Sequence, residues 1–269
     1  MTDRIFTKQD IQNQLSDMKA PRDSVVLMHS SLRLVGPVEG GPRGLLDALI
    51  DYFTSQGGLF CVPTHTWDNL RKDITLDMSD PHTCLGALPD LAAADPRGVR
   101  SQNPTHSMVV FGPRERALAF ITDDATVCSG TAPESCYGKL YSMGGRVLLV
   151  GVAHNKNTYL HCVDEILKTP DRMCEETRDM AVRLTSGEVV RRRFRMYQSS
   201  FTRDISSRFP KYETAFRYHG AITDGFVGRA PTQLCDARIM MQTVSTILSR
   251  ANGADPLSDE VAILPALYC

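Results

Sequence analysis

The chain has 269 residues, of which 42% are hydrophobic and 23% are charged. A chain of this length buries a substantial core, and the composition excludes collagen, coiled coils and wholesale disorder. Lys and Arg total 30 against 31 Asp and Glu. Because the basic excess that binds a phosphate backbone is absent, we expect no nucleic-acid partner.

Location and redox state follow from two further features. The first ten residues are charged from the third position and lack the apolar run of a signal peptide, and no other segment has the roughly 18 apolar residues of a spanning helix. We therefore predict a cytoplasmic protein without membrane contact. The eight cysteines show no CxxC spacing, so we expect reduced, mostly buried thiols.

Short apolar runs that are typical of buried strands alternate with helical patterns. The runs cover residues 25–28, 59–62, 108–111 and 147–150. The first run is followed by Gly40-Gly41-Pro42 and an amphipathic stretch from Leu45 to Phe53, which stops at Gly57-Gly58. Proline at the start and glycine beyond the end mark this stretch as a helix.

The second half of the chain has a different pattern. Residues 181–197 alternate between apolar and polar side chains around Ser186-Gly187, which predicts an antiparallel hairpin. Residues 230–248 read as a final helix after a glycine-containing segment. We find no repeat and no low-complexity linker, so residues 1–269 are predicted to form a single α/β domain.

Polar residues follow the predicted strands, where open α/β sheets build their sites. The segments are residues 28–32, 63–67, 103–107 and 157–165. In the last of them, Asn157 or Thr158 can cap a helix that holds His161 in its first turn, with Asp164 and Glu165 on the same side. The helix dipole disfavours a charged imidazole there, so His161 is either a general base or a hydrogen-bonded core histidine.

The residues also allow two other interpretations. His65, Asp68 and His106 could serve a metal-dependent hydrolase, but no tight pair such as HExxH occurs. The turn His29-Ser30-Ser31-Leu32 precedes glycines and a helix start, which can hold a phosphate or can simply be a capped turn. A Walker sequence and a dinucleotide GxGxxG motif are both absent.

Taken together, these segments resemble the aminoglycoside 3-N-acetyltransferase family. That family carries an HSSL turn before a Gly-Gly loop, a P-T-x-T segment, an arginine segment ending in PTHS, a leucine-rich strand ending in Gly-Val, and a helix with a histidine and a glutamate. In this chain the matching segments run in the same order over residues 26–41, 63–66, 100–107, 147–152 and 157–165. The resemblance covers nearly the whole chain.

The resemblance implies a mixed central sheet flanked by helices with an antiparallel hairpin insertion, distinct from the fold of the commoner acetyltransferase superfamily. It also implies acetyl-CoA as co-substrate, no metal, and an aminoglycoside acceptor in a resistance enzyme that is a monomer or a homodimer. His161 would be the base, oriented by Glu165 or Asp204. The implied cofactor-binding residues are His29, Ser30, Ser31, Leu32, Thr66, Arg100 and Ser107.

A polycationic acceptor needs acidic residues, and several fall in predicted loops after these motifs. Asp68, Glu175 and Glu176 are the candidates that we name for acceptor binding. Hydroxyl or backbone donors around Thr66 and Ser107 are candidates for stabilising the oxyanion. Two alternatives stay open at this point: an acetyltransferase that acts on a different amine, and a CoA-binding protein without turnover.

Overall fold

The computed structural model describes residues 4–198, 204–258 and 261–269. Its main sheet has seven strands in the order β4-β5-β2-β1-β6-β10-β9. These are β1 Val25–Ser30, β2 Leu59–Pro63, β4 Val99–Arg100, β5 Met108–Phe111, β6 Arg146–Val150, β9 Ile222–Val227 and β10 Ala230–Asp236. Strands β2, β1 and β6 are parallel, and the flanking pairs are antiparallel. The predicted mixed sheet is confirmed, and the four predicted strand runs are β1, β2, β5 and β6.

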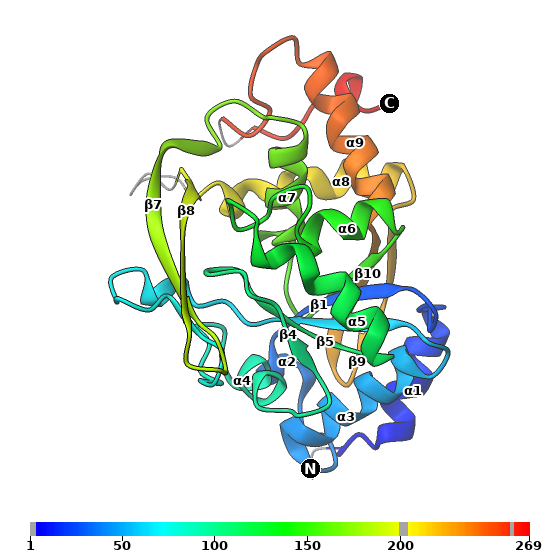
Figure 1. The fold of residues 1–269 in the computed structure, drawn as a ribbon. Coiled ribbons are helices and arrows are strands. Elements are labelled where there is room, and N and C mark those ends of the chain that lie inside the picture. Colours follow the sequence, from blue (N-terminus) through cyan, green and yellow to red (C-terminus); the bar gives the residue numbers. More distant parts are fainter. Residues whose placement is uncertain (1–3, 199–203, 259–260) are drawn as a thin grey trace.

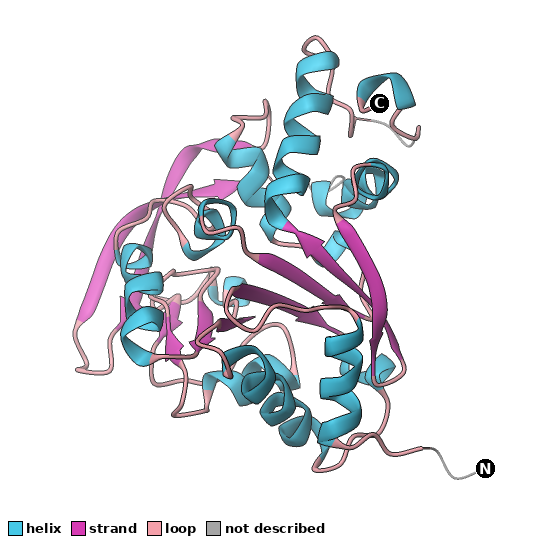
Figure 2. Ribbon diagram, turned by 90° about the vertical axis from the view of Figure 1, so that its right-hand side faces the viewer, coloured by secondary structure: helices cyan, strands magenta, loops and turns pink. Residues whose placement is uncertain are grey.

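Helices cover both faces of this sheet, as Figure 2 shows. One group consists of α1 Lys8–Asp17, α3 Gly41–Thr54 and α4 Ala87–Ala93. The other consists of α5 Arg114–Ile121, α6 Cys136–Ser142, α7 Tyr159–Ile166, α8 Glu213–Tyr218 and α9 Ala237–Arg250. Successive strand residues point to opposite faces, so Val25 and Leu27 pack under the second group, whereas Val26 and Met28 pack under the first.

A second sheet of three strands, in the order β3-β7-β8, lies beside the first (Figure 1). Its strands are β3 Leu76–Asp77, β7 Met173–Arg183 and β8 Val189–Tyr197. We call β7, β8 and their turn at residues 184–188 the arm. The predicted hairpin is confirmed at its turn, but β7 begins eight residues before position 181, which is where alternation becomes visible.

The predicted helix over residues 230–248 is correct only in its second part. Residues 230–236 form strand β10, which pairs with β6 on one side and β9 on the other. Asp236 then caps α9, and its side chain accepts hydrogen bonds from the N–H groups of Arg238 and Ile239. The strand was missed because the apolar residues of β10 run directly into those of α9, so the two elements look like one helical pattern in the sequence.

Short elements complete the chain. They are α2 Leu32–Val35 and the 3₁₀ helices η1 Trp67–Asn69, η2 Thr122–Ala125, η3 His154–Lys156, η4 Ile205–Tyr212 and η5 Pro265–Leu267. The predicted helix after Gly40-Gly41-Pro42 is α3, with Pro42 in its first turn. Within the described residues, no helix has the length and apolarity needed to cross a membrane.

Candidate functional site

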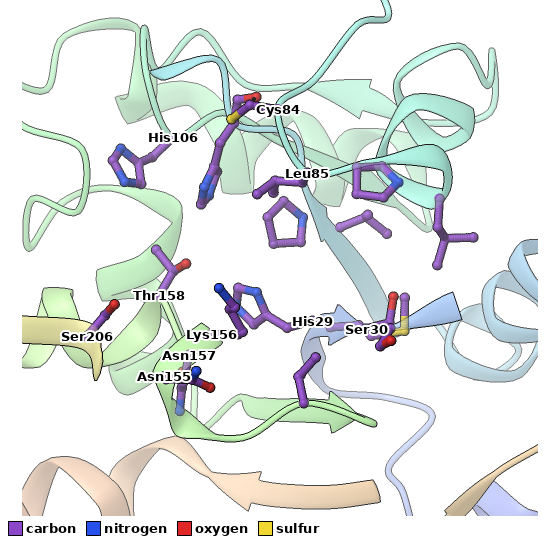
Figure 3. A pocket seen from close by; sticks show the side chains of 18 of the residues that line it. His29, Ser30, Cys84, Leu85, His106, Asn155, Lys156, Asn157, Thr158 and Ser206 are labelled. Atoms are coloured by element: carbon purple, nitrogen blue, oxygen red, sulfur yellow. Dashed lines mark hydrogen bonds between the residues drawn. The ribbon is translucent and has the colours of Figure 1, made fainter. Parts of the chain in front are cut away.

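A cavity of about 750 Å³ opens at the carboxyl edge of the three parallel strands. Its lining comes from the ends of β1 and β2, from the segment around the start of α4, from His106, from Val152 and residues 155–158 after β6, and from parts of α7 and η4. Figure 3 shows these side chains converging from the separate segments. The volume lies in the range of small-molecule sites, and the location is the one that open α/β sheets use for ligands.

The end of β1 supplies the residues predicted to bind the cofactor, since His29, Ser30, Ser31 and Leu32 all line the cavity. The N–H of Ser31 donates to the carbonyl of Val150 at 2.9 Å, which extends the pairing of β1 with β6 to the cavity edge. His29 is 8% exposed. Burial, and secondarily the charge of Lys156, lowers the pKa of His29 to about 3.

His161 lies in the first turn of α7, as predicted, and it lines the cavity. Burial lowers the pKa of its imidazole to about 4, and the charge of Arg172 acts in the same direction. The carboxylate of Asp204 opposes this shift. His161 is therefore uncharged near pH 7 and can accept a proton. Its Nδ1 atom is buried and has no hydrogen-bond partner among the described residues.

Asp204 lies at the start of η4 and lines the same cavity. Its Oδ1 atom accepts a hydrogen bond from the N–H of Ser206 at 3.0 Å, which fixes the carboxylate at the N-terminus of η4. Of the described residues that line the cavity, Asp204 is the only carboxylate and Lys156 is the only Lys or Arg.

Two further histidines face the cavity, His65 after β2 and His106 before β5. Their ring centroids are 4.5 Å apart. His65 Nε2 is 2.8 Å from the hydroxyl of Tyr137, and His106 Nδ1 is 2.8 Å from Thr105 Oγ1. Burial lowers the pKa of His65 well below 6.5 and that of His106 to about 3. The cavity thus contains four uncharged imidazoles.

Glu165 lies elsewhere than predicted. It is on α7, but Ser129 Oγ donates to its Oε1 atom and Thr131 Oγ1 donates to its Oε2 atom at 3.2 Å. Burial raises the pKa of Glu165, and these two hydrogen bonds partly oppose the shift. Asp164 also turns away from the cavity, with Oδ2 located 3.3 Å from Nε of the buried Arg172. Neither carboxylate lines the cavity with His161.

Thr66, Arg100 and Ser107 do not line the cavity. Thr66 Oγ1 donates to the carbonyl of Pro104 at 2.9 Å, and Ser107 Oγ donates to the carbonyl of Thr64 at 2.6 Å. Arg100 Nη2 donates to that same Thr64 carbonyl at 3.2 Å. These hydroxyls are already engaged with the backbone, so their contacts join the end of β2 to the segment before β5.

The acidic residues named for acceptor binding do not line the cavity either. Asp68 follows Trp67, which does line it, but the Asp68 carboxylate lies 3.4 Å from Nε2 of the exposed His82. Glu175 and Glu176 are exposed on strand β7 rather than in a loop. The expectation of a loop was wrong because the register shift between Met173 and Thr177 interrupts the alternation there.

Sequence reasoning missed other lining residues. Lys156 belongs to η3, a short helix that no sequence motif predicts. Cys84 lies in the long connection after β2. Cys84 Sγ donates to the carbonyl of His65 at 3.2 Å. His65 and His106 were named only as candidates for a metal-dependent hydrolase, although both lie in motifs that follow or precede predicted strands. Among the described residues, no group of three or more His, Cys, Asp or Glu side chains is arranged to hold a metal ion.

Comparison with known proteins identifies relatives of the chain. The family model described as aminoglycoside 3-N-acetyltransferase matches residues 27–249. Aminoglycoside N(3)-acetyltransferase IV from Salmonella sp is 31% identical over 166 residues, which is 61% of this chain and 61% of that protein. Aminoglycoside N(3)-acetyltransferase VII from Streptomyces paromomycinus is 28% identical over 264 residues, covering 88% of this chain and 89% of its own.

A solved structure agrees with these matches. The crystal structure of aminoglycoside acetyltransferase AAC(3)-IVa, as a histidine-to-alanine mutant in complex with a gentamicin, superposes with a TM-score of 0.78 at 26% identity. It covers 94% of this chain and 92% of that chain. The family match extends over most of the chain and includes every segment that lines the cavity. The chain therefore belongs to the aminoglycoside 3-N-acetyltransferase family.

Proposed function

We propose that this protein transfers the acetyl group of acetyl-CoA to the 3-amino group of a 2-deoxystreptamine aminoglycoside, with His161 as the general base. One observation carries the proposal. In a chain of this family, an uncharged imidazole and a carboxylate share the cavity at the carboxyl edge of the sheet. An acetyltransferase of this kind confers resistance to the drug that it acetylates.

The proton balance of the reaction explains the need for a base. An aliphatic ammonium first loses one proton to solvent, because only the neutral amine has a lone pair for attack. The new N–C bond then forms, the C–S bond breaks, and the nitrogen gives up a second proton. His161 accepts this proton and, as imidazolium, can pass it to the departing sulfur.

Asp204 is the carboxylate that we assign to His161. It raises the pKa of the imidazole, which means that its charge favours the protonated form that His161 takes during the reaction. We assign the other end of the cavity to the co-substrate, with His29, Ser30, Ser31 and Leu32 along its wall. The positive charge of Lys156, which lines the cavity, would attract the diphosphate of CoA.

Because the protein would use acetyl-CoA, we infer a cytoplasmic location. We also infer that the active form is a monomer or a homodimer, and that neither nucleic acid nor a membrane is a partner. Thr66, Arg100 and Ser107 would act on the co-substrate indirectly, by holding the end of β2. Asp68, Glu175 and Glu176 would contact an acceptor only where it extends outside the cavity.

A thiol-release assay with gentamicin, tobramycin, kanamycin and apramycin tests the proposal. We expect saturable release of CoA with at least one of the four drugs, a product acetylated at the 3-amino group by NMR, and no release without acceptor. If none is acetylated while CoA still binds by calorimetry, the aminoglycoside assignment fails. Turnover of an unrelated amine would then identify a different acceptor, and its absence would leave a CoA-binding protein.

A further inference from the structure

Tyr197, the last residue of β8, contacts His161 in two ways. The two ring centroids are 4.4 Å apart with an interplanar angle of 57°. In addition, the Tyr197 hydroxyl donates a hydrogen bond to the backbone carbonyl of His161. One side chain of the arm therefore touches both the imidazole and the backbone of the residue that carries it.

The hydroxyl of Tyr197 also belongs to a larger hydrogen-bond network. Because the Tyr197 hydroxyl donates its only hydrogen to the His161 carbonyl, Thr131 Oγ1 is the donor to the Tyr197 oxygen at 2.7 Å. Glu165 Oε2, at 3.2 Å from Thr131 Oγ1, is the second acceptor of the same hydrogen. Ser129 Oγ donates to the other oxygen of the same carboxylate. These contacts connect α7, the loop at residues 126–135, and β8. Because Glu165 lies one helical turn after His161, the network holds α7 at two successive turns.

Two further contacts define where Tyr197 and His161 lie. The loop runs beside β8, because the N–H of Arg195 donates to the carbonyl of Cys128 at 2.6 Å and Ser129 pairs with Arg195 as a β-bridge. Phe209, on η4, packs edge-on against the imidazole, with centroids 4.9 Å apart and an angle of 67°. The ring of His161 is thus packed against aromatic rings from both the arm and η4.

We propose that Tyr197 is a positioning residue for His161, and that Thr131 and Glu165 act through it by holding its hydroxyl. The proposal rests on the proposed function, in which His161 is the base, and it gives Glu165 an indirect part. Directed hydrogen bonds and a ring contact restrict both the position and the rotation of the imidazole. The base is therefore aligned by the arm rather than by its own helix alone.

Tyr197→Phe tests the proposal because it keeps the ring and removes the hydroxyl. We expect kcat to fall on the order of 10-fold, as a base held slightly out of line loses rate steeply, while KM for acetyl-CoA stays within about twofold. The imidazole resonance of His161, followed by NMR in isotope-labelled protein, should titrate closer to pH 6.5 than in the wild type, since a looser site admits water.

Matched variants separate positioning from general stability. Tyr212→Phe is the control, because the buried Tyr212 hydroxyl has no hydrogen-bond partner in the described part of the chain; its kinetics and the His161 titration should match the wild type. Thr131→Val should reproduce the effects of Tyr197→Phe, and Thr131→Ser should restore wild-type values. The Tyr197→Phe/Thr131→Val double variant should be little worse than either single variant, as expected for one network.

The result that overturns the inference is a Tyr197→Phe protein with a lower melting temperature but unchanged kcat and unchanged His161 titration. A different result would contradict the proposed function, namely that His161→Gln leaves turnover intact. In that case the NMR titration of His161 in the Tyr197→Phe variant would still show whether Tyr197 fixes the imidazole ring. The two hypotheses are therefore tested by separate measurements on the same set of proteins.

Discussion

The carboxyl edge of the sheet and the arm both contact His161 or its cavity, but their residues are fixed by different forces. Strands β1 and β2 are buried on both faces, and apolar packing above and below determines where the strands end. The arm is largely exposed and rich in charge, and directed hydrogen bonds hold its last residue. The sheet edge thus provides a stable cavity, whereas the arm provides alignment.

This difference has a practical consequence for substitutions. Apolar packing is spread over many contacts, so the loss of any one polar group from the cavity walls should change the stability of the fold little. A directed network depends on each donor and acceptor, so single hydroxyl deletions near the arm should change rate more than stability. Substitutions of His161, of Asp204, of the buried His154 and of the exposed acidic residues test this contrast.

The largest expected effect is that of His161→Gln. Loss of the base should reduce kcat by about 10²–10⁴-fold, because general base catalysis contributes that much. The affinity for CoA, measured by calorimetry, should stay within about twofold, since the walls at β1 are unchanged. An unaltered kcat would remove His161 from the mechanism.

Asp204→Asn should have the next largest effect. Removal of the charge leaves the imidazolium less stabilised as it forms, so kcat should fall by about 10–10²-fold. Because the Asp204 carboxylate raises the pKa of His161, the variant should show a still lower pKa for this imidazole by NMR. A matched Glu165→Gln variant should not lower that pKa, because Glu165 reaches His161 only through Thr131 and Tyr197. A fall as large as that of Asp204→Asn would show direct contact between Glu165 and the base.

Acid stability should depend on the buried histidines. His154 is fully buried outside the cavity, and burial lowers its pKa to about 4. The unfolded chain binds a proton near pH 6.5 and the folded chain does so only near pH 4, so folding free energy is lost as pH falls between these values. His154→Gln should reduce this pH slope by up to about 1.4 kcal/mol per pH unit, measured by urea unfolding from pH 7 to pH 4.5.

The smallest effects should come from the acidic residues outside the cavity. Asp68→Asn, Glu175→Gln and Glu176→Gln should each change KM for the acceptor by less than about threefold, because exposed charges are screened by water and salt. The assay is acceptor saturation at about 50 mM and 300 mM NaCl. A change of about 10-fold at low salt in any of the three would show that the acceptor extends to that residue.

Much of the sheet edge was predictable because burial leaves a clear pattern. Apolar runs located β1, β2, β5 and β6, and the motifs after them located His29, His161 and, less directly, His65. The sequence pattern of the arm is weaker. The register shift between Met173 and Thr177 interrupts the alternation at the start of β7. The alternation in β8 does not indicate that Tyr197 contacts α7.

Polar contacts between distant segments were the hardest to predict. Spacing along α7 suggested that Glu165 would face His161, but Ser129 and Thr131, more than thirty residues earlier, bind that carboxylate instead. Similarly, the hydroxyls of Thr66 and Ser107 bond to the backbone instead of facing the cavity. Periodicity reports which face of an element is buried, and it does not report which polar partner satisfies a side chain on that face.

The turn at residues 184–188 joins two strands of the second sheet, so its length is independent of the pairing between β1, β2 and β6. Insertions or deletions at that tip would leave Tyr197 and the cavity walls in place. Natural variation can therefore lengthen or shorten the arm at this turn without rebuilding the cavity.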